Sequence, residues 1–185
     1  MIDILIIGAG GAGLTSAIRA KESGVKRVVV MSKSYPTESQ TAMAQGGINA
    51  NLDKSLDSFI DDTVKSAQGL GDIKTIKKFI TGANDAINFL DSIGVPFNRD
   101  IDNSIQQRQL GGASDKRACF SSDYSGLKIL QTLFDKALEV EVEFIYEHQL
   151  IDFIIKDDTD IQNRRVLGVK ALDIRYTTIK IFQAK

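Results

Sequence analysis

Three glycines near the amino terminus have the spacing of a nucleotide-binding turn. Gly8, Gly10 and Gly13 form the pattern Gly-x-Gly-x-x-Gly. In such a turn the first glycine permits a tight bend, the second lets the backbone approach a pyrophosphate, and the third lets a helix pack closely on a strand. Phosphate oxygens then accept hydrogen bonds from N–H groups at the positive end of the helix dipole. The pattern predicts a dinucleotide site; the alternative is a glycine-rich turn without a ligand.

The elements around these glycines are the ones that the pattern requires. Residues 2–7 are an apolar run that predicts a fully buried parallel strand, residues 11–23 form an amphipathic helix, and residues 28–31 form a second buried strand. A βαβ unit is the setting in which this glycine pattern indicates dinucleotide binding. We therefore expect an α/β fold with a Rossmann-like central parallel sheet.

The rest of the chain predicts helices followed by a small sheet. Helices are expected near residues 55–68, 73–93 and 126–139, the second with Asp72 as its N-cap. Strand-like runs lie at 142–146, 150–155, 166–174 and 176–183, and the last of them are consistent with a terminal β-meander. The polar, glycine-bearing segments 33–53 and 98–126 are expected to be irregular.

The end of the second strand lacks the acidic residue that usually binds a ribose about 20 residues after the glycines. The strand ends in Met31-Ser32-Lys33. Ser32 can still hydrogen-bond a ribose hydroxyl, and Lys33 could contact a phosphate or a ring nitrogen. An NADP site is a second-rank interpretation of Lys33, and a solvated strand end is the other alternative.

Composition narrows the class of protein further. The 23 Lys and Arg residues nearly balance 24 Asp and Glu residues, which argues against a nucleic-acid surface. The single cysteine, Cys119, and the single histidine, His148, predict neither a disulfide nor a Cys/His metal site. We expect Cys119 to be a small buried hydrophobe. The sequence shows no signal-peptide pattern and no apolar run of the ~18 residues that span a bilayer, so we expect a cytoplasmic protein without a transmembrane segment of its own.

A second glycine pair lies among small residues in the segment 39–50. Gly46 and Gly47 would let the backbone run flat against a planar ligand and offer N–H donors at close range. Considered alone, the pair is equally typical of a plain loop. After a dinucleotide pattern it becomes a candidate cradle for an isoalloxazine ring.

These motifs, in this order, resemble the flavoprotein subunit of succinate dehydrogenase and fumarate reductase, with L-aspartate oxidase as a relative. The motifs are Gly-Ala-Gly-Gly-Ala-Gly at 8–13, Ser-Lys-x-Tyr-Pro at 32–36, Ser-x-Thr…Ala-x-Gly-Gly at 39–47, Asp-Thr-Val-Lys at 62–65, Gly-Val-Pro-Phe at 94–97, Arg108 with Gly111-Gly112, and Arg-Ala-Cys-Phe-Ser-Ser-Asp-Tyr-Ser-Gly at 117–126. The resemblance implies an FAD-dependent oxidoreductase whose Rossmann-like domain is of the glutathione-reductase type.

The resemblance also implies which residues contact the cofactor. The FAD-binding residues would be Gly8, Gly10, Gly11, Gly13, Ser32, Lys33, Ser39, Gln40, Thr41, Gln45, Gly46 and Gly47, with the backbone near Gln149 and Leu150 on the adenine side. Substrate-side candidates are Gln45, Leu110 and Gly111. We expect His148 to be either structural or a neighbour of a bound flavin rather than a general base. Respiratory members usually attach FAD through a histidine at the position of Gln40. Because an amide is not a nucleophile, we expect non-covalent FAD, as in aspartate oxidases.

By the same resemblance, the chemistry is hydride transfer through flavin N5 in succinate/fumarate interconversion. Electrons would pass to an iron–sulfur partner, and a membrane anchor subunit would hold the complex at the cytoplasmic face of the inner membrane. Arg108 and Arg117 could meet the dicarboxylate; the alternative is surface pairing with Asp115 or Asp123. The residues leave the reaction direction open, because Gln45 matches the succinate-dehydrogenase type whereas Gln40 favours fumarate reduction or an oxidase.

Family members continue well beyond 185 residues, with a second FAD-contacting strand and a capping domain. We therefore expect residues 1–185 to be the N-terminal part of an FAD-binding domain, inactive alone, with its catalytic residues beyond Lys185. Two other functions remain open: an L-aspartate oxidase-type flavoenzyme and a non-catalytic nucleotide-binding fragment.

Overall fold

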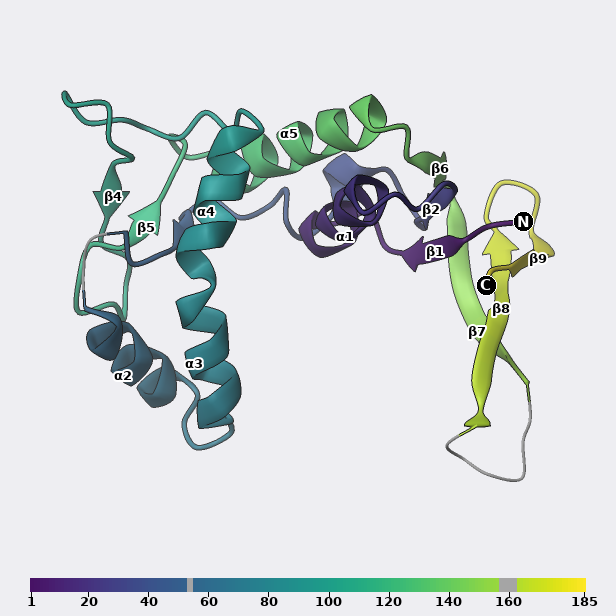
Figure 1. Cartoon of the computed structure of the whole chain (residues 1–185), viewed down its shortest axis with the longest axis horizontal. Coiled ribbons are helices and arrows are strands. Elements are labelled where there is room, and N and C mark those ends of the chain that lie inside the picture. Colours follow the sequence, from purple (N-terminus) through teal and green to yellow (C-terminus); the bar gives the residue numbers. More distant parts are fainter. Residues whose placement is uncertain (53–54, 157–162) are drawn as a thin grey trace. The chain divides into compact units, whose positions relative to one another are not determined.

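The computed structural model describes residues 1–52, 55–156 and 163–185 (Figure 1). The chain forms two compact units. Unit 1 comprises residues 1–42 and 133–185, and unit 2 comprises residues 43–132. The predicted glycine turn lies in unit 1, and the Gly46-Gly47 pair lies in unit 2.

Unit 1 is built on the predicted βαβ motif. Strand β1 (Ile4–Ile7), helix α1 (Gly11–Glu22) and strand β2 (Val28–Met31) follow one another, and β1 pairs in parallel with β2. Strand β6 (Glu143–Ile145) adds to the other side of β2, also in parallel, which gives the order β1-β2-β6. Helix α1 buries Leu14, Ala17 and Ile18, which lie on one side of the helix. The parallel α/β arrangement is confirmed.

The prediction that the first strand is fully buried is wrong. Strand β1 is an edge strand, and the side chains of Ile4 and Ile7 are 37% and 39% exposed. The four residues of β2, which lies between two strands, are all buried. A short apolar run indicates a strand, but it cannot distinguish a central position from an edge, because that depends on which partners pair alongside it.

The predicted terminal meander is confirmed as an antiparallel sheet of strands β7 (His148–Lys156), β8 (Arg165–Asp173) and β9 (Thr178–Gln183). Val169 and Ala171 of β8 pack with Met31 of β2 in one buried cluster, so the meander packs against the parallel sheet. Other apolar side chains of the meander remain exposed: Ile151, Phe153, Ile155, Ile179 and Ile181.

Unit 2 contains helices α2 (Leu56–Ser66), α3 (Ile73–Thr81) and α4 (Ala83–Ser92). The prediction of one continuous helix over 73–93 is wrong, because Gly82 ends α3 and precedes α4. Glycine is a poor helix former, so the sequence tolerates a break at this position. Asp72 caps α3 as expected, since its carboxylate accepts a hydrogen bond from Thr75 N at 2.8 Å.

The segments expected to be irregular contain short elements as well. A 3₁₀ turn η1 (Pro36–Glu38) and strand β3 (Ile48–Asn49) lie in the first, whose residue 53 falls outside the described residues. Strands β4 (Gln107–Arg108) and β5 (Ala118–Cys119) lie in the second, and the three strands pair in the order β3-β5-β4. Helix α5 (Ser125–Glu139) follows, close to its predicted bounds. This small sheet places residues 118–119 between residues 48–49 and residues 107–108.

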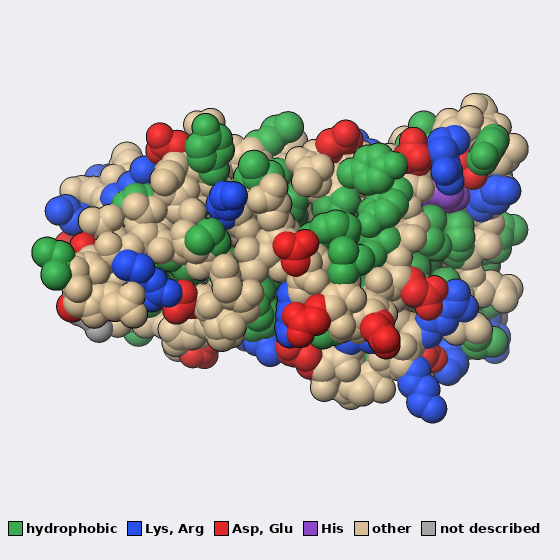
Figure 2. Space-filling view, turned by 90° about the horizontal axis from the view of Figure 1, so that it is seen from above, with side chains coloured by type: hydrophobic (Ala, Val, Ile, Leu, Met, Phe, Trp, Pro, Cys, Tyr) green, Lys and Arg blue, Asp and Glu red, His purple; other side chains and the backbone are tan. Residues whose placement is uncertain are grey.

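The face shown in Figure 2 carries Lys and Arg side chains interspersed with Asp and Glu, and hydrophobic side chains lie among them. This mixture agrees with the formal net charge of −1. Among the residues that the structure describes, no helix combines the length and the apolar character needed to cross a bilayer.

Candidate nucleotide-binding site

The glycine turn between β1 and α1 has the close packing that its spacing predicts. A Cβ atom at Gly13 would lie 1.9 Å from the carbonyl oxygen of Gly8, so only glycine fits at this crossing of helix and strand. Gly8 itself has a φ of +104°, which side chains rarely adopt. Its N–H group donates to Met31 O at 2.8 Å, which ties the turn to the end of β2.

The segment 39–41 lies against the first turn of α1. The N–H group of Gly11 donates to Thr41 Oγ1 at 3.0 Å, and a Cβ atom at Gly10 would lie 3.5 Å from the same oxygen. Ser39 Oγ is buried and has no hydrogen-bond partner. Because buried hydroxyls are normally paired, this orphaned oxygen fits a polar group of a ligand at the turn. The structure thus places Ser39 and Thr41 beside the glycines, whereas Gln40 between them is exposed.

The end of β2 is tied to the strands on which the adenine side was expected. Ser32 N donates to Ile145 O at 2.9 Å, and Ser32 O accepts from His148 N at 3.0 Å. Gln149 and Leu150 follow directly in β7, where they pair with β8. Lys33 is exposed. The backbone of Ser32 therefore connects the second strand of the βαβ motif to the start of the meander.

His148 and Cys119 occupy positions that suit structural roles. His148 is buried: its Nδ1 lies 2.7 Å from Tyr146 O, and its Nε2 lies 3.6 Å from Asp173. Cys119 is fully buried, and this burial raises the pKa of its thiol to about 11. A thiol with that pKa is protonated at neutral pH and therefore unreactive.

In unit 2, Gly47 of the Gly46-Gly47 pair lies where a side chain cannot fit. Gly47 has a φ of +117°, and a Cβ atom there would lie 2.5 Å from Cys119 O. A Cβ atom at Gly46 would lie 3.3 Å from Leu110, so this predicted substrate-side residue contacts the glycine pair directly. Gln45 is exposed, and its carbonyl oxygen accepts from Ser125 Oγ at 3.3 Å.

The two arginines near Gly111-Gly112 are engaged by the protein itself. Arg108 donates to the backbone carbonyls of Gln45 and Gly46 and lies 3.4 Å from Asp123. Arg117 is 1% exposed; it pairs with Asp62 at 2.9 Å and with Asp115 at 3.4 Å. The expected partners Asp115 and Asp123 are therefore found, but Arg117 is buried rather than at the surface. Both guanidinium groups therefore already have partners within the protein.

Asp62 is also a partner of Arg117, and the sequence did not predict this ion pair. Ser114 donates to its carboxylate through N–H at 2.7 Å and through Oγ at 2.8 Å, and these hydrogen bonds lower the pKa of Asp62. Asp62 opens the Asp-Thr-Val-Lys motif at 62–65, which was the available signal. Its contacts tie helix α2 to the loop before β5.

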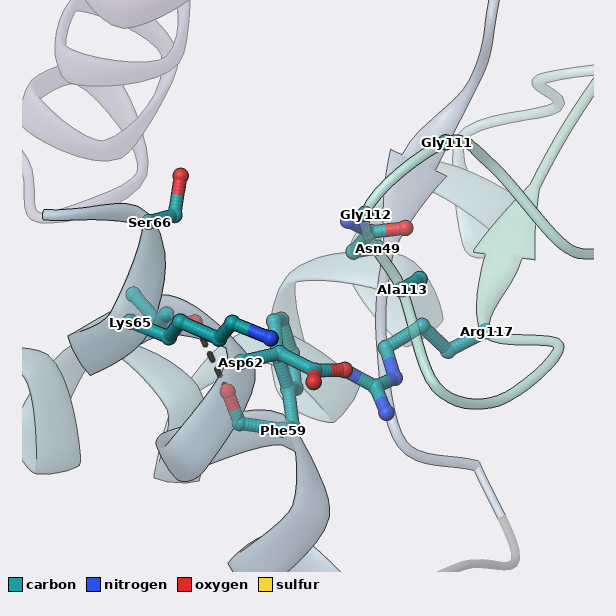
Figure 3. Close-up of a pocket in the computed structure, with 10 residues that line it drawn as sticks. Asn49, Phe59, Asp62, Lys65, Ser66, Gly111, Gly112, Ala113 and Arg117 are labelled. Atoms are coloured by element: carbon teal, nitrogen blue, oxygen red, sulfur yellow. Dashed lines mark hydrogen bonds and ion pairs between the residues drawn. The ribbon is translucent and has the colours of Figure 1, made fainter.

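A cavity of about 430 Å³ lies between α2 and this loop. In Figure 3, Lys65 and Asp62 of α2 face Gly111 and Gly112, and the guanidinium of Arg117 points toward Asp62. Gly111 lines this cavity whereas Leu110 packs on Gly46, so the structure gives these two substrate-side candidates different surroundings. Within the described ranges, no group of three His, Cys, Asp or Glu side chains could hold a metal ion.

The βαβ motif of unit 1 and its glycine turn indicate a dinucleotide-binding domain. The family described as "FAD binding domain" matches residues 3–185, and the chain belongs to this family.

Similar proteins identify the kind of FAD-binding domain. The chain is 43% identical to the 8-methylmenaquinol:fumarate reductase flavoprotein subunit of Wolinella succinogenes, over 99% of this chain and 30% of that protein. It is 35% identical to the succinate dehydrogenase flavoprotein subunit of Rickettsia bellii, over 98% of this chain and 31% of that protein. Its structure matches a variant of FrdA from E. coli quinol fumarate reductase with a TM-score of 0.89 and 29% identity, over 99% of this chain and 31% of that one.

The chain therefore corresponds to an FAD-binding region of succinate dehydrogenase and fumarate reductase flavoprotein subunits. It spans less than a third of the length of these relatives.

Proposed function

We propose that this chain binds FAD non-covalently through the residues expected from the sequence. The observation that carries the proposal is the turn at 8–13, where Gly13 packs on Gly8 O and the Gly11 N–H group meets Thr41. Beside it, the orphaned hydroxyl of Ser39 supplies a polar group for a bound nucleotide. Gly8, Gly10, Gly11 and Gly13 would hold the pyrophosphate with Ser39 and Thr41. Ser32, Lys33 and the backbone at Gln149-Leu150 would contact the adenosine portion.

Gln45, Gly46 and Gly47 would lie against the flavin ring, with Leu110 and Gly111 toward the substrate. Gln40 supports the non-covalent mode, because its amide cannot form the bond that a histidine forms. When bound, FAD supplies the hydride and electron transfer, and the protein supplies binding, orientation and electrostatics.

We propose that the complete protein interconverts succinate and fumarate, on the strength of the names of its relatives. The proposal includes an iron–sulfur partner that accepts electrons, a membrane anchor subunit, and a location at the cytoplasmic face of the membrane. Because Arg108 and Arg117 are engaged, the groups that bind the dicarboxylate would come from outside residues 1–185. An L-aspartate oxidase-type enzyme is the second candidate, and Gln40 is the observation that favours it.

The test of FAD binding uses the purified 185-residue chain. We expect uptake of added FAD with an absorbance band near 450 nm, and release of all flavin on acid precipitation because no covalent bond forms. A colourless chain that takes up no FAD would refute the binding proposal. Flavin that stays with the precipitated protein would refute the non-covalent mode alone.

A further inference from the structure

Arg108 of β4 is hydrogen-bonded to two successive carbonyl groups of the glycine-pair segment. Its Nε donates to Gly46 O at 3.0 Å, and its Nη2 donates to Gln45 O at 2.9 Å. All three residues belong to unit 2. The arginine therefore contacts this loop through its backbone, so the contact does not depend on the side chain at position 45.

These two hydrogen bonds determine the direction of two peptide groups. A trans peptide carries its C=O and its N–H on opposite sides. Since both carbonyls point toward the guanidinium, the N–H groups of Gly46 and Gly47 point away from it. Within the part of the chain that the structure describes, neither N–H group donates a hydrogen bond. The glycine pair therefore presents two available donors on the side opposite Arg108.

The guanidinium is itself held in place by the neighbouring strand region. It lies over the ring of Phe120, 4.4 Å from the ring centre, and its Nη1 lies 3.4 Å from Asp123. Asp123 is 82% exposed, so this ion pair contributes little. A planar arginine can stack on a ring and donate to two acceptors at once, whereas a lysine presents one compact charge. The geometry therefore requires arginine rather than any cation.

We propose that Arg108 is a positioning residue for the cofactor: it orients the Gly46 and Gly47 N–H groups toward the flavin ring and adds positive charge behind them. This inference rests on the proposed FAD binding. N–H donors and nearby positive charge stabilise negative charge, and the ring gains negative charge on reduction. Arg108 consequently raises the reduction potential of the bound flavin as well as its affinity.

The experiment compares Arg108→Lys and Arg108→Met with the native 185-residue chain. Arg99→Lys is the matched control, because Arg99 lies in the same unit, is partly exposed and pairs with Asp91. FAD affinity is measured by fluorescence titration, the midpoint potential by equilibration with redox dyes, and the fold by thermal unfolding.

We expect Arg108→Lys to weaken FAD binding about tenfold, which equals about 1.4 kcal/mol. Arg108→Met should also lower the preference for reduced flavin about tenfold, which lowers the two-electron potential by about 30 mV. Arg108→Lys keeps the charge, so its potential should fall less. The control variant should match the native chain in both measurements.

The outcomes separate this inference from the proposed function. A native chain that binds no FAD refutes the FAD proposal. If the native chain binds FAD and Arg108→Lys binds it equally well, at an unchanged potential, Arg108 only stabilises the loop and the inference is overturned. Should Arg108→Met fail to fold, the lysine variant decides the question, since it retains the charge and most of the side-chain volume.

Discussion

Replacing Gly13 by alanine tests whether the turn packs as tightly as its spacing requires. The new Cβ atom would lie 1.9 Å from Gly8 O, where real contacts essentially never fall below 3.0 Å. The two atoms must therefore separate by about 1.1 Å, and such overpacking costs about 1–3 kcal/mol. Alanine recovers up to about 1 kcal/mol as a better helix former than glycine. Because the atom in the way belongs to the main chain rather than to a flexible side chain, the destabilisation by overpacking should lie at or above the upper end of the range of about 1–3 kcal/mol.

We expect a net loss of about 2 kcal/mol in the free energy of unfolding, or roughly 4–8 °C in the melting temperature for a chain of this size. Thermal and urea unfolding followed by circular dichroism measure it. Gly11→Ala is the control in the same helix, because its Cβ atom would meet only side chains, those of Thr41 and Leu133. Equal stability of the Gly13 and Gly11 variants would refute the packing argument.

The remaining predictions concern binding, acid stability and thiol reactivity. Gly10→Ala should fold normally, since the added Cβ atom makes only ordinary contacts with Thr41 and Ser39. It should bind FAD at least tenfold more weakly, because the backbone can no longer approach the phosphates. An FAD titration curve equal to that of the native chain would contradict this prediction. Hydrogen bonds from Thr75 lower the pKa of the Asp72 carboxyl in the folded chain, so this group stabilises the fold above pH 3.8 and loses that effect as the pH falls through its folded-state pKa. Asp72→Asn should therefore show a smaller difference in the free energy of unfolding between pH 5 and pH 2 than the native chain, as measured by urea unfolding. Cys119 has a thiol pKa of about 11. At pH 8 it should react with an aromatic disulfide reagent at least a hundredfold more slowly in the native chain than in denaturant. Comparable rates would show that strand β5 does not bury this thiol in solution.

The local elements follow from the sequence because short-range rules govern them. The strand–turn–helix at 4–22 is predicted by an apolar run, a glycine spacing and a helical period, all read within a few residues of one another. The Asp72 cap follows from a carboxylate that precedes a helical run. The break at Gly82 was missed because the apolar period continues across it, and the period alone carries no information about the hydrogen bonds of each turn.

The chemical class of the candidate site could also be predicted, because glycines with that spacing after a strand are suited to few ligands. For the arginines the sequence suggested Asp115 and Asp123 as partners, but it could not predict the burial of Arg117 or the contacts of Arg108 with the glycine-pair segment. Arg117 is separated by 55 residues from Asp62, and Arg108 by 62 residues from Gly46, so only the folded chain shows that one arginine is buried in an ion pair and the other orients two peptide groups. Whether a strand lies at the edge or the centre of its sheet, whether a side chain is exposed or buried, and whether a charged group has a partner all depend on neighbours that are distant in sequence. The amino-acid sequence alone therefore predicts the cofactor-binding turn of this protein. The ion pair of Arg117 with Asp62 and the hydrogen bonds of Arg108 to the glycine-pair segment are determined only by tertiary contacts, because those partners are far away in the sequence.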